Sequence, residues 1–155
     1  MIDGYGRTID YVRISVTDRC NLRCVYCMPE EGVGSISHEE ILRFGEIERV
    51  CQILAENGIQ KIKLTGGEPL VRRRLPELAA ALKRIPGIKS LTITTNGVLL
   101  EEMYDALADA GVDSVTISLD TLDASVYRQL TRRDEIEAVR RGLRTAIQKG
   151  RMQIK

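Results

Sequence analysis

Five short segments that alternate apolar and polar residues, separated by helical patterns, constrain the fold of this chain more than any other feature. They span residues 11–16, 61–65, 90–95, 113–119 and 152–155. Alternation with a period of two is typical of strands, and strands that alternate with helices are typical of βαβ units in a parallel sheet. The sequence therefore predicts an α/β fold in one domain: an incomplete parallel (β/α) barrel, truncated after about five strands.

The stretches between these segments carry the start and stop signals of helices. Ser37-His38-Glu39-Glu40 has the pattern of a capping box, which predicts a helix from there to about Glu56. Its expected apolar stripe comprises Ile41, Phe44, Ile47, Val50, Cys51 and Leu54. Further helices are expected over residues 76–85, 101–110 and 135–149, with a short turn near residues 125–130.

Each predicted strand has one apolar face and one polar face. The polar faces carry Arg13, Ser15, Lys63, Thr65, Thr92, Thr94, Ser114, Thr116, Ser118, Gln153 and Lys155. If helices cover the apolar faces, these side chains line the inside of a curved sheet, and the cations among them suit an anionic ligand. A sheet with one solvated face is the alternative, and the sequence does not exclude it.

Three of the four cysteines lie within eight positions, directly after the first predicted strand. Cys20, Cys24 and Cys27 have the spacing C-x3-C-x2-C, which supplies three thiolates from one loop where a closed metal site needs four ligands. A cubane iron–sulfur cluster held by three cysteines keeps one iron open to a substrate or cofactor. We therefore expect these residues to hold a [4Fe-4S] cluster and Cys51 to be a buried core residue.

Two other interpretations of the cysteines are open. A structural zinc site needs a fourth ligand, and only His38 could supply it. Disulfides would leave one of the three clustered cysteines unpaired, and nothing else in the sequence suggests secretion.

The composition excludes several functional classes. Lys and Arg number 23 against 22 Asp and Glu, whereas a dedicated nucleic-acid binder usually has a strong basic excess. No apolar run is long enough to span a bilayer, and the N-terminus lacks a signal-peptide pattern. Because a thiolate cluster needs a reducing compartment, a cytoplasmic location is expected, with no nucleic-acid or membrane partner.

Candidate functional motifs follow four consecutive predicted strands. They are the cysteine loop, Thr65–Pro69, Thr95–Gly97 and Asp120-Thr121. In parallel barrels the functional loops follow the carboxyl ends of the strands, so we expect these motifs to meet on one rim.

The segment Val12–Pro29 closely resembles the GTP 3′,8-cyclase family (MoaA-type) of the radical S-adenosylmethionine (SAM) enzymes, and Thr65–Leu70 and Thr94–Gly97 fit the same family. The resemblance implies a lyase of molybdenum cofactor biosynthesis. In that family SAM on the reduced cluster is cleaved to a 5′-deoxyadenosyl radical. The radical starts the cyclisation of GTP to (8S)-3′,8-cyclo-7,8-dihydroguanosine 5′-triphosphate.

The same resemblance implies site residues beyond the three cysteines. SAM contacts are implied at Tyr26, Gly67 and Ser118. GTP contacts are implied at Arg13, Lys63, Thr94 and Lys155. Lys63 stands where the family more typically has Arg, and Lys keeps the charge but loses the bidentate fork.

The family also carries a second [4Fe-4S] cluster on three C-terminal cysteines, and this sequence has no second cysteine triad. Residues 1–155 are therefore expected to be the N-terminal part of a radical SAM core, without the second-cluster region and inactive on GTP alone. A low-potential electron donor is expected, and a homodimer stays open. The alternatives are another radical SAM enzyme, such as a peptide-modifying one, and a non-catalytic metal-binding module.

Overall fold

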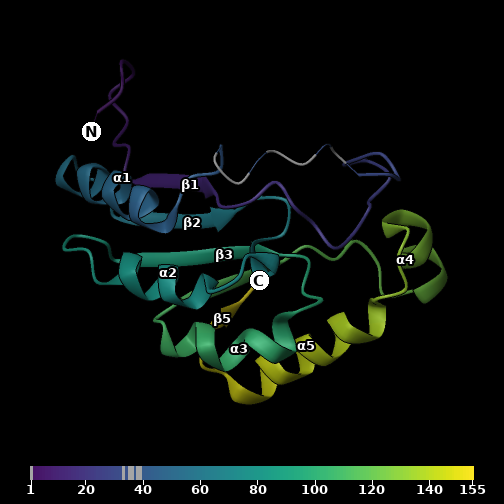
Figure 1. Ribbon diagram of the computed structural model, residues 1–155. Helices are drawn as coiled ribbons and strands as arrows, with labels where there is room; N and C mark the ends of the chain where they lie inside the picture. The colour runs from purple at the N-terminus through teal and green to yellow at the C-terminus, as the bar shows by residue number, and fades with distance from the viewer. Residues whose placement is uncertain (1, 33, 35–36, 38–39) are drawn as a thin grey trace.

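One parallel sheet of five strands, in the order β1-β2-β3-β4-β5, organises the computed structural model, which describes residues 2–32, 34, 37 and 40–155 (Figure 1). The strands are β1 (Tyr11–Ser15), β2 (Lys61–Thr65), β3 (Ser90–Thr95), β4 (Ser114–Ile117) and β5 (Gln153–Ile154). Each strand pairs with the next one along the chain, which is the arrangement of an incomplete (β/α) barrel. The predicted fold class is confirmed, and β4 and β5 are shorter than expected.

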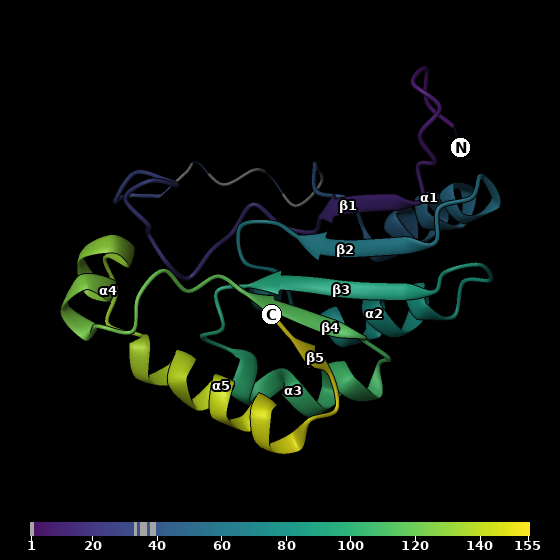
Figure 2. The same cartoon turned by 180° about the vertical axis from the view of Figure 1, so that it is seen from behind.

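Helices cover the apolar face of this sheet. They are α1 (Phe44–Glu56), α2 (Leu75–Lys83), α3 (Leu100–Asp109) and α5 (Ile136–Lys149), with a 3₁₀ turn η1 (Pro69–Val71). The remaining helix, α4 (Ala124–Thr131), lies beyond the carboxyl ends of the strands (Figure 1). Strand residues Leu64 and Ile93 form one buried core with Ile47, Leu78 and Tyr104 of the helices. Both views show α1 and α2 on one side of the strands, and α5 beside α3 (Figures 1 and 2). None of the helices in the described residues is long and apolar enough to cross a membrane.

The polar face of the sheet is the side seen in Figure 2, where the strands lie in front of α1 and α2. Arg13 pairs in register with Lys63, and Thr94 pairs with Thr116, so these side chains share one face. Arg13 is exposed, while Lys63 and Thr94 are half-buried. In the described residues this face is therefore at least partly open to solvent, and its role as the lining of an anion-binding site stays a prediction.

The helix predicted from Ser37 begins instead at Phe44. The carboxylate of Glu46 accepts the Arg43 backbone N–H at 2.6 Å, so the helix start lies several residues after the predicted capping box. Glu40 does accept hydrogen bonds from the Ser37 N–H and hydroxyl, at 3.3 and 3.0 Å, but these close a local turn. Residues 38 and 39 of the predicted box lie outside the described residues.

The apolar stripe predicted for α1 is partly wrong. Ile47 and Cys51 are buried, as expected, whereas Val50 is 44% exposed. Ile41 precedes the helix, because the helix begins at Phe44.

The turn predicted near residues 125–130 is an eight-residue helix, α4. The side chain of Asp123 accepts a hydrogen bond from the Val126 N–H at 2.8 Å, which satisfies one of the free donors at the helix start. An N-terminal cap therefore stabilises a helix where the sequence pattern indicated only a turn.

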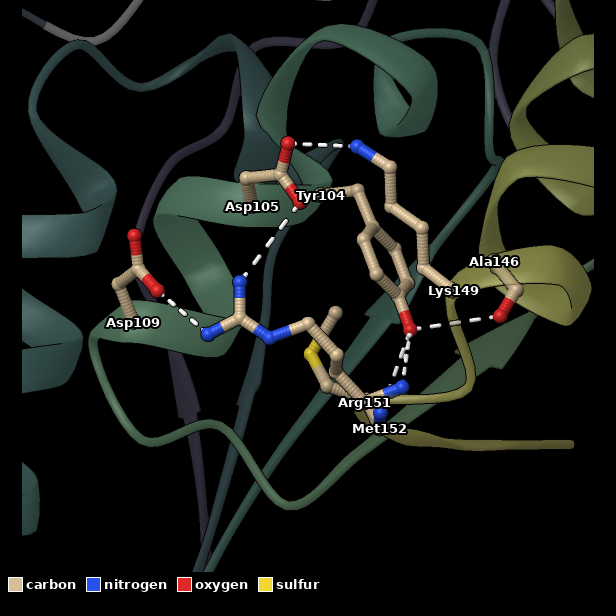
Figure 3. Close-up of polar contacts among 7 residues, drawn as sticks. All are labelled: Tyr104, Asp105, Asp109, Ala146, Lys149, Arg151 and Met152. Carbon is tan, nitrogen blue, oxygen red and sulfur yellow. Dashed lines mark hydrogen bonds and ion pairs between the residues drawn. The ribbon is translucent and has the colours of Figure 1, made fainter.

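Tyr104 ties α3, α5 and the start of β5 together (Figure 3). Its hydroxyl donates to the Ala146 carbonyl at 3.3 Å and accepts from the backbone N–H groups of Arg151 and Met152, at 2.9 and 3.2 Å. The ring is fully buried. One side chain thus satisfies three backbone groups where the chain leaves α5 for the last strand.

Candidate functional site

The three clustered cysteines lie in one loop directly after β1. The Cys24 carbonyl accepts hydrogen bonds from the backbone N–H groups of Cys27 and Met28, at 2.9 and 3.1 Å. This turn brings Cys24 and Cys27 to the same part of the loop. Cys20 and Cys24 are half-buried, and Cys27 is exposed. All four cysteines of the chain are free thiols, which overturns the disulfide interpretation, and Cys51 is fully buried as predicted.

Helix α4 holds the outer part of this loop. The backbone N–H groups of Arg23 and Val25 donate to the carbonyls of Thr131 and Leu130, at 3.0 and 2.8 Å. The Arg23 guanidinium donates to the Cys20 carbonyl at 2.7 Å. The C-terminal end of α4 and the Arg23 side chain therefore fix the backbone around Cys20 and Cys24.

Gly66 and Gly67, after β2, run against the inner part of the same loop. The Gly67 N–H donates to the Thr17 carbonyl at 2.7 Å. A Cβ at Gly67 would lie 2.7 Å from the carbonyl oxygen of Asp18 and closer still to that of Arg19. Because glycine has no side chain, the backbone at Gly67 can lie directly against the backbone of the cysteine loop. A larger residue at position 67 would displace that loop. A substitution there would therefore affect cluster binding as well as SAM binding.

Glu68 links the carboxyl ends of β2 and β3, although it is only 1% exposed. Its carboxylate accepts from the Thr95 hydroxyl at 2.6 Å, from the Asn96 N–H at 2.7 Å and from the Leu70 N–H at 3.0 Å. Burial raises the pKa of this carboxyl, and the three hydrogen bonds oppose that rise. The carboxylate therefore brings two of the predicted rim motifs together.

Asn96 places an amide beside the first cysteine. Its Nδ2 donates to Asn21 Oδ1 at 2.7 Å and lies 3.9 Å from Cys20 Sγ. The Leu22 N–H also donates to Cys20 Sγ, at 3.4 Å. Two N–H donors therefore point at the sulfur of Cys20, where a thiolate would need them.

Tyr26 reaches the loop that follows β4. Its hydroxyl donates to Asp120 Oδ2 at 2.5 Å, and the residue is 66% exposed. Asp120 raises the pKa of the Tyr26 hydroxyl, and burial adds to the rise. The contact makes the cysteine loop and the Asp120 loop neighbours, as predicted for one rim.

The electrostatics of Cys20 and Cys24 show what a bound cationic group would change. Burial raises the pKa of Cys20, and the negative charges of Glu68, Cys24 and Cys27 raise it further. Burial and the charge of Cys27 also raise the pKa of Cys24, against a lowering by the Tyr26 hydroxyl. Both shifts favour the protonated thiols, and a bound iron group would supply the positive charge that stabilises their thiolate forms.

The zinc interpretation gains no ligand from the structure. His38 lies outside the described residues. Within residues 2–32, 34, 37 and 40–155, no group of three or more His, Cys, Asp or Glu side chains is arranged to hold a metal ion, and this includes Cys20, Cys24 and Cys27.

The other implied site residues fall into two sets. Ser118 follows β4, where its N–H donates to the Thr95 carbonyl at 2.8 Å, and it shares a small cavity with Cys24 and Tyr26. Gly67 contacts the cysteine loop directly. The implied GTP residues Arg13, Lys63 and Thr94 instead lie on strands β1, β2 and β3, and Lys155 directly follows β5, at the opposite edge of the sheet from Arg13.

A larger cavity of about 620 Å³ lies at the start of the cysteine loop and is lined by Arg19, Arg43, Arg72 and Arg73, among others. The Arg72 guanidinium donates to the Val16 carbonyl and, at 2.6 Å, to the Leu42 carbonyl. It also lies 4.5 Å from the centre of the Phe44 ring. Arg72 therefore holds the start of the loop against the segment that leads into α1.

Sequence reasoning missed the roles of Glu68, Asn96 and Asp120. All three lie in the motifs that it singled out at the ends of strands, but their partners are far away in the sequence. Only the expectation of one rim could have suggested that Glu68 meets Asn96 or that Asp120 meets the cysteine loop.

Comparison with known proteins gives the family and the fold. A family model described as the Radical SAM superfamily matches residues 14–152. The solved structure of anSMEcpe with bound AdoMet superposes with a TM-score of 0.72 at 19% identity, over 94% of this chain and 40% of that one.

Two curated relatives are more similar in sequence. The GTP 3′,8-cyclase of Pelotomaculum thermopropionicum is 54% identical over 150 residues, which cover 97% of this chain and 46% of the relative. The GTP 3′,8-cyclase of Petrotoga mobilis is 49% identical over 150 residues, with the same coverage of 97% and 46%. The chain thus spans about half the length of the curated relatives it matches.

Proposed function

The chain belongs to the radical SAM superfamily, and from this premise we propose that it is the cluster-binding and SAM-binding part of a GTP 3′,8-cyclase. The observation that carries the proposal is the 54% identity to a GTP 3′,8-cyclase over 97% of the chain. The geometry supports it, because three free thiols share one loop against the ends of β2, β3 and β4.

In this proposal Cys20, Cys24 and Cys27 hold a [4Fe-4S] cluster. When bound there, the cluster would supply the electron for cleaving SAM, and SAM would supply the radical. The residues around it hold the ligands in position: the N–H groups directed at Cys20 Sγ stabilise the thiolate, and Glu68 fixes the rim beside it. Such supporting contacts decide how well a metal site is pre-organised.

The residues proposed for SAM are Tyr26, Gly67 and Ser118, and all three lie at the cysteine loop or beside its cavity. The residues proposed for GTP are Arg13, Lys63, Thr94 and Lys155. Arg13 and Lys63 are neighbours in register on the open polar face, and like charges side by side favour an anionic ligand. A low-potential electron donor and a cytoplasmic location follow from the cluster chemistry.

Because the chain spans about half of its relatives, turnover of GTP by these residues alone is not part of the proposal. The proposal does include weak, salt-sensitive binding of a nucleoside triphosphate. Removing a charge-assisted hydrogen bond to a phosphate costs about 1.5–3 kcal/mol, which is roughly tenfold or more in affinity.

Calorimetric titration of GTP and ATP into the wild type, Arg13→Ala and Arg49→Ala at two salt concentrations tests this part of the proposal. Arg49 is the matched control, since it is exposed on α1, on the other side of the sheet. We expect affinity to fall in Arg13→Ala and at high salt, and to be unchanged in Arg49→Ala. Binding that is indifferent to both Arg13 and salt would contradict the assignment of the polar face to GTP.

A further inference from the structure

Helix α4 places a second tyrosine, Tyr127, near the cysteine loop. The proposed function assigns no role to this residue. Tyr127 is 4% exposed, and its ring packs with Ile136 and Val139 in a small hydrophobic cluster. The same helix accepts the backbone hydrogen bonds of Arg23 and Val25 at its C-terminal end. The ring is thus held by the element that supports the loop around Cys24.

The hydroxyl of Tyr127 has no hydrogen-bond partner among the described residues. A buried hydroxyl without a partner destabilises a protein, and phenylalanine would fill the same space without that cost. The apolar neighbours of the ring explain an aromatic residue at this position, but they do not explain the hydroxyl.

A cavity of about 40 Å³ brings Tyr127 and Cys24 together. Leu22, Asn96, Ser118 and Asp120 also line it. The cavity therefore lies between α4 and three of the loops that form the rim. A group held at Cys24 would be the neighbour of Tyr127 across this space.

Charge favours a protonated, donating hydroxyl. Burial, and then the negative charge of Cys24, raise the pKa of Tyr127 to about 12; Glu135 and Cys20 contribute less, and the nearby Thr131 side chain lowers the pKa slightly without meeting hydrogen-bond geometry. At neutral pH the hydroxyl therefore keeps its proton and is able to donate it to an acceptor across the cavity.

We propose that the Tyr127 hydroxyl donates a hydrogen bond to sulfur of the iron–sulfur group held at Cys24 and thereby raises its reduction potential. The inference rests on the proposed function, because it needs a cluster on the three cysteines. Hydrogen bonds to the sulfurs are among the factors that set the potential of such clusters, since they stabilise the more negative, reduced state.

An EPR-monitored redox titration tests the inference on wild type, Tyr127→Phe and Tyr11→Phe, each reconstituted anaerobically with iron and sulfide. Tyr11→Phe is the matched control, because it removes the same atom from an exposed residue at the start of β1. We expect the ratio of reduced to oxidised cluster at a fixed potential to fall by about threefold to tenfold in Tyr127→Phe, the equilibrium effect of one hydrogen bond. Tyr11→Phe should match the wild type. Equal potentials in all three proteins, at equal iron content, would overturn the inference.

Thermal unfolding of the metal-free proteins separates this role from a structural one. Because the hydroxyl has no partner in the described residues, metal-free Tyr127→Phe should unfold at the wild-type temperature or above it. A clear fall in that temperature would mean that the hydroxyl is bonded within the protein, and would refute the inference. Iron and sulfide analysis of the wild type distinguishes failure of the proposed function: without a cluster in the wild type, both fail, whereas a cluster whose potential ignores Tyr127 removes only the inference.

Discussion

The Tyr26 hydroxyl donates a hydrogen bond to Asp120 Oδ2 at 2.5 Å, across 94 residues of sequence. Tyr26 lies between the last two clustered cysteines, and Asp120 follows β4. The bond therefore ties the outer part of the cysteine loop to the far side of the rim.

Removing this bond should loosen the loop without unfolding the protein. Tyr26 is 66% exposed, so Tyr26→Phe should change the free energy of unfolding by about 1 kcal/mol or less. Amide hydrogen exchange should become faster at Cys27 and Met28, and it should be unchanged in α5. Equal exchange at Cys27 and Met28 in both proteins would mean that the Tyr26–Asp120 bond does not hold the loop.

The four cysteines are expected to have two different roles, three as cluster ligands and one as a core residue. Replacing Cys20, Cys24 or Cys27 by Ala should abolish cluster assembly, because two thiolates do not hold a cubane stably. Cys51→Ala should keep the iron content of the wild type and lose about 1 kcal/mol of stability, since Cys51 is fully buried. Iron and sulfide analysis after anaerobic reconstitution gives the answer, and equal iron loss in Cys51→Ala would contradict the three-ligand assignment.

Glu68 should make the metal-free chain less stable as the pH rises. Burial raises the pKa of its carboxyl in the folded state above the unfolded value, so the folded state binds the proton more tightly. The stability from this group is present at a pH below the unfolded pKa and is lost as the pH rises through the folded pKa.

Urea unfolding midpoints across this pH range check the prediction for Glu68. Glu68→Gln should flatten the fall in stability with pH, because an amide does not titrate there. At the upper end of the range it should also lack part of the hydrogen bonding, since a neutral amide cannot accept all three of the hydrogen bonds that the carboxylate accepts. A slope that is the same in both proteins would show that another group is responsible.

Tyr104 should matter for stability far more than its surface neighbours. Tyr104→Phe leaves the N–H groups of Arg151 and Met152 without their acceptor, and buried unsatisfied groups cost about 1–3 kcal/mol (Figure 3). Lys149→Ala, which removes an exposed ion pair to Asp105, should cost about 1 kcal/mol or less. Urea denaturation of both variants measures the difference, and equal costs would contradict the role of the Tyr104 hydroxyl.

The sequence predicted the sheet well because a period of two is a local signal that tertiary contacts here reinforce. The start of α1 was missed for a local reason too: Ser37 and Glu40 do bond to each other, but Glu46 caps the helix at Arg43. A short-range pattern identified a real contact without showing which turn continues as a helix.

The site was harder to predict in its supporting contacts than in its ligands. Spacing alone singled out the three cysteines. The hydrogen bond of Glu68 to Asn96 and the bond of Tyr26 to Asp120 depend on strands that bring distant residues together. Neither the spacing nor the composition carries that information.

Reductive cleavage of SAM by the anaerobically reconstituted chain tests the central claim most directly. With dithionite as the reductant, the account predicts an iron- and sulfide-containing protein that converts SAM to 5′-deoxyadenosine and methionine. Cys27→Ala should form neither the cluster nor these products. A wild-type protein that binds zinc alone, or that assembles the cluster and leaves SAM intact, would contradict the account.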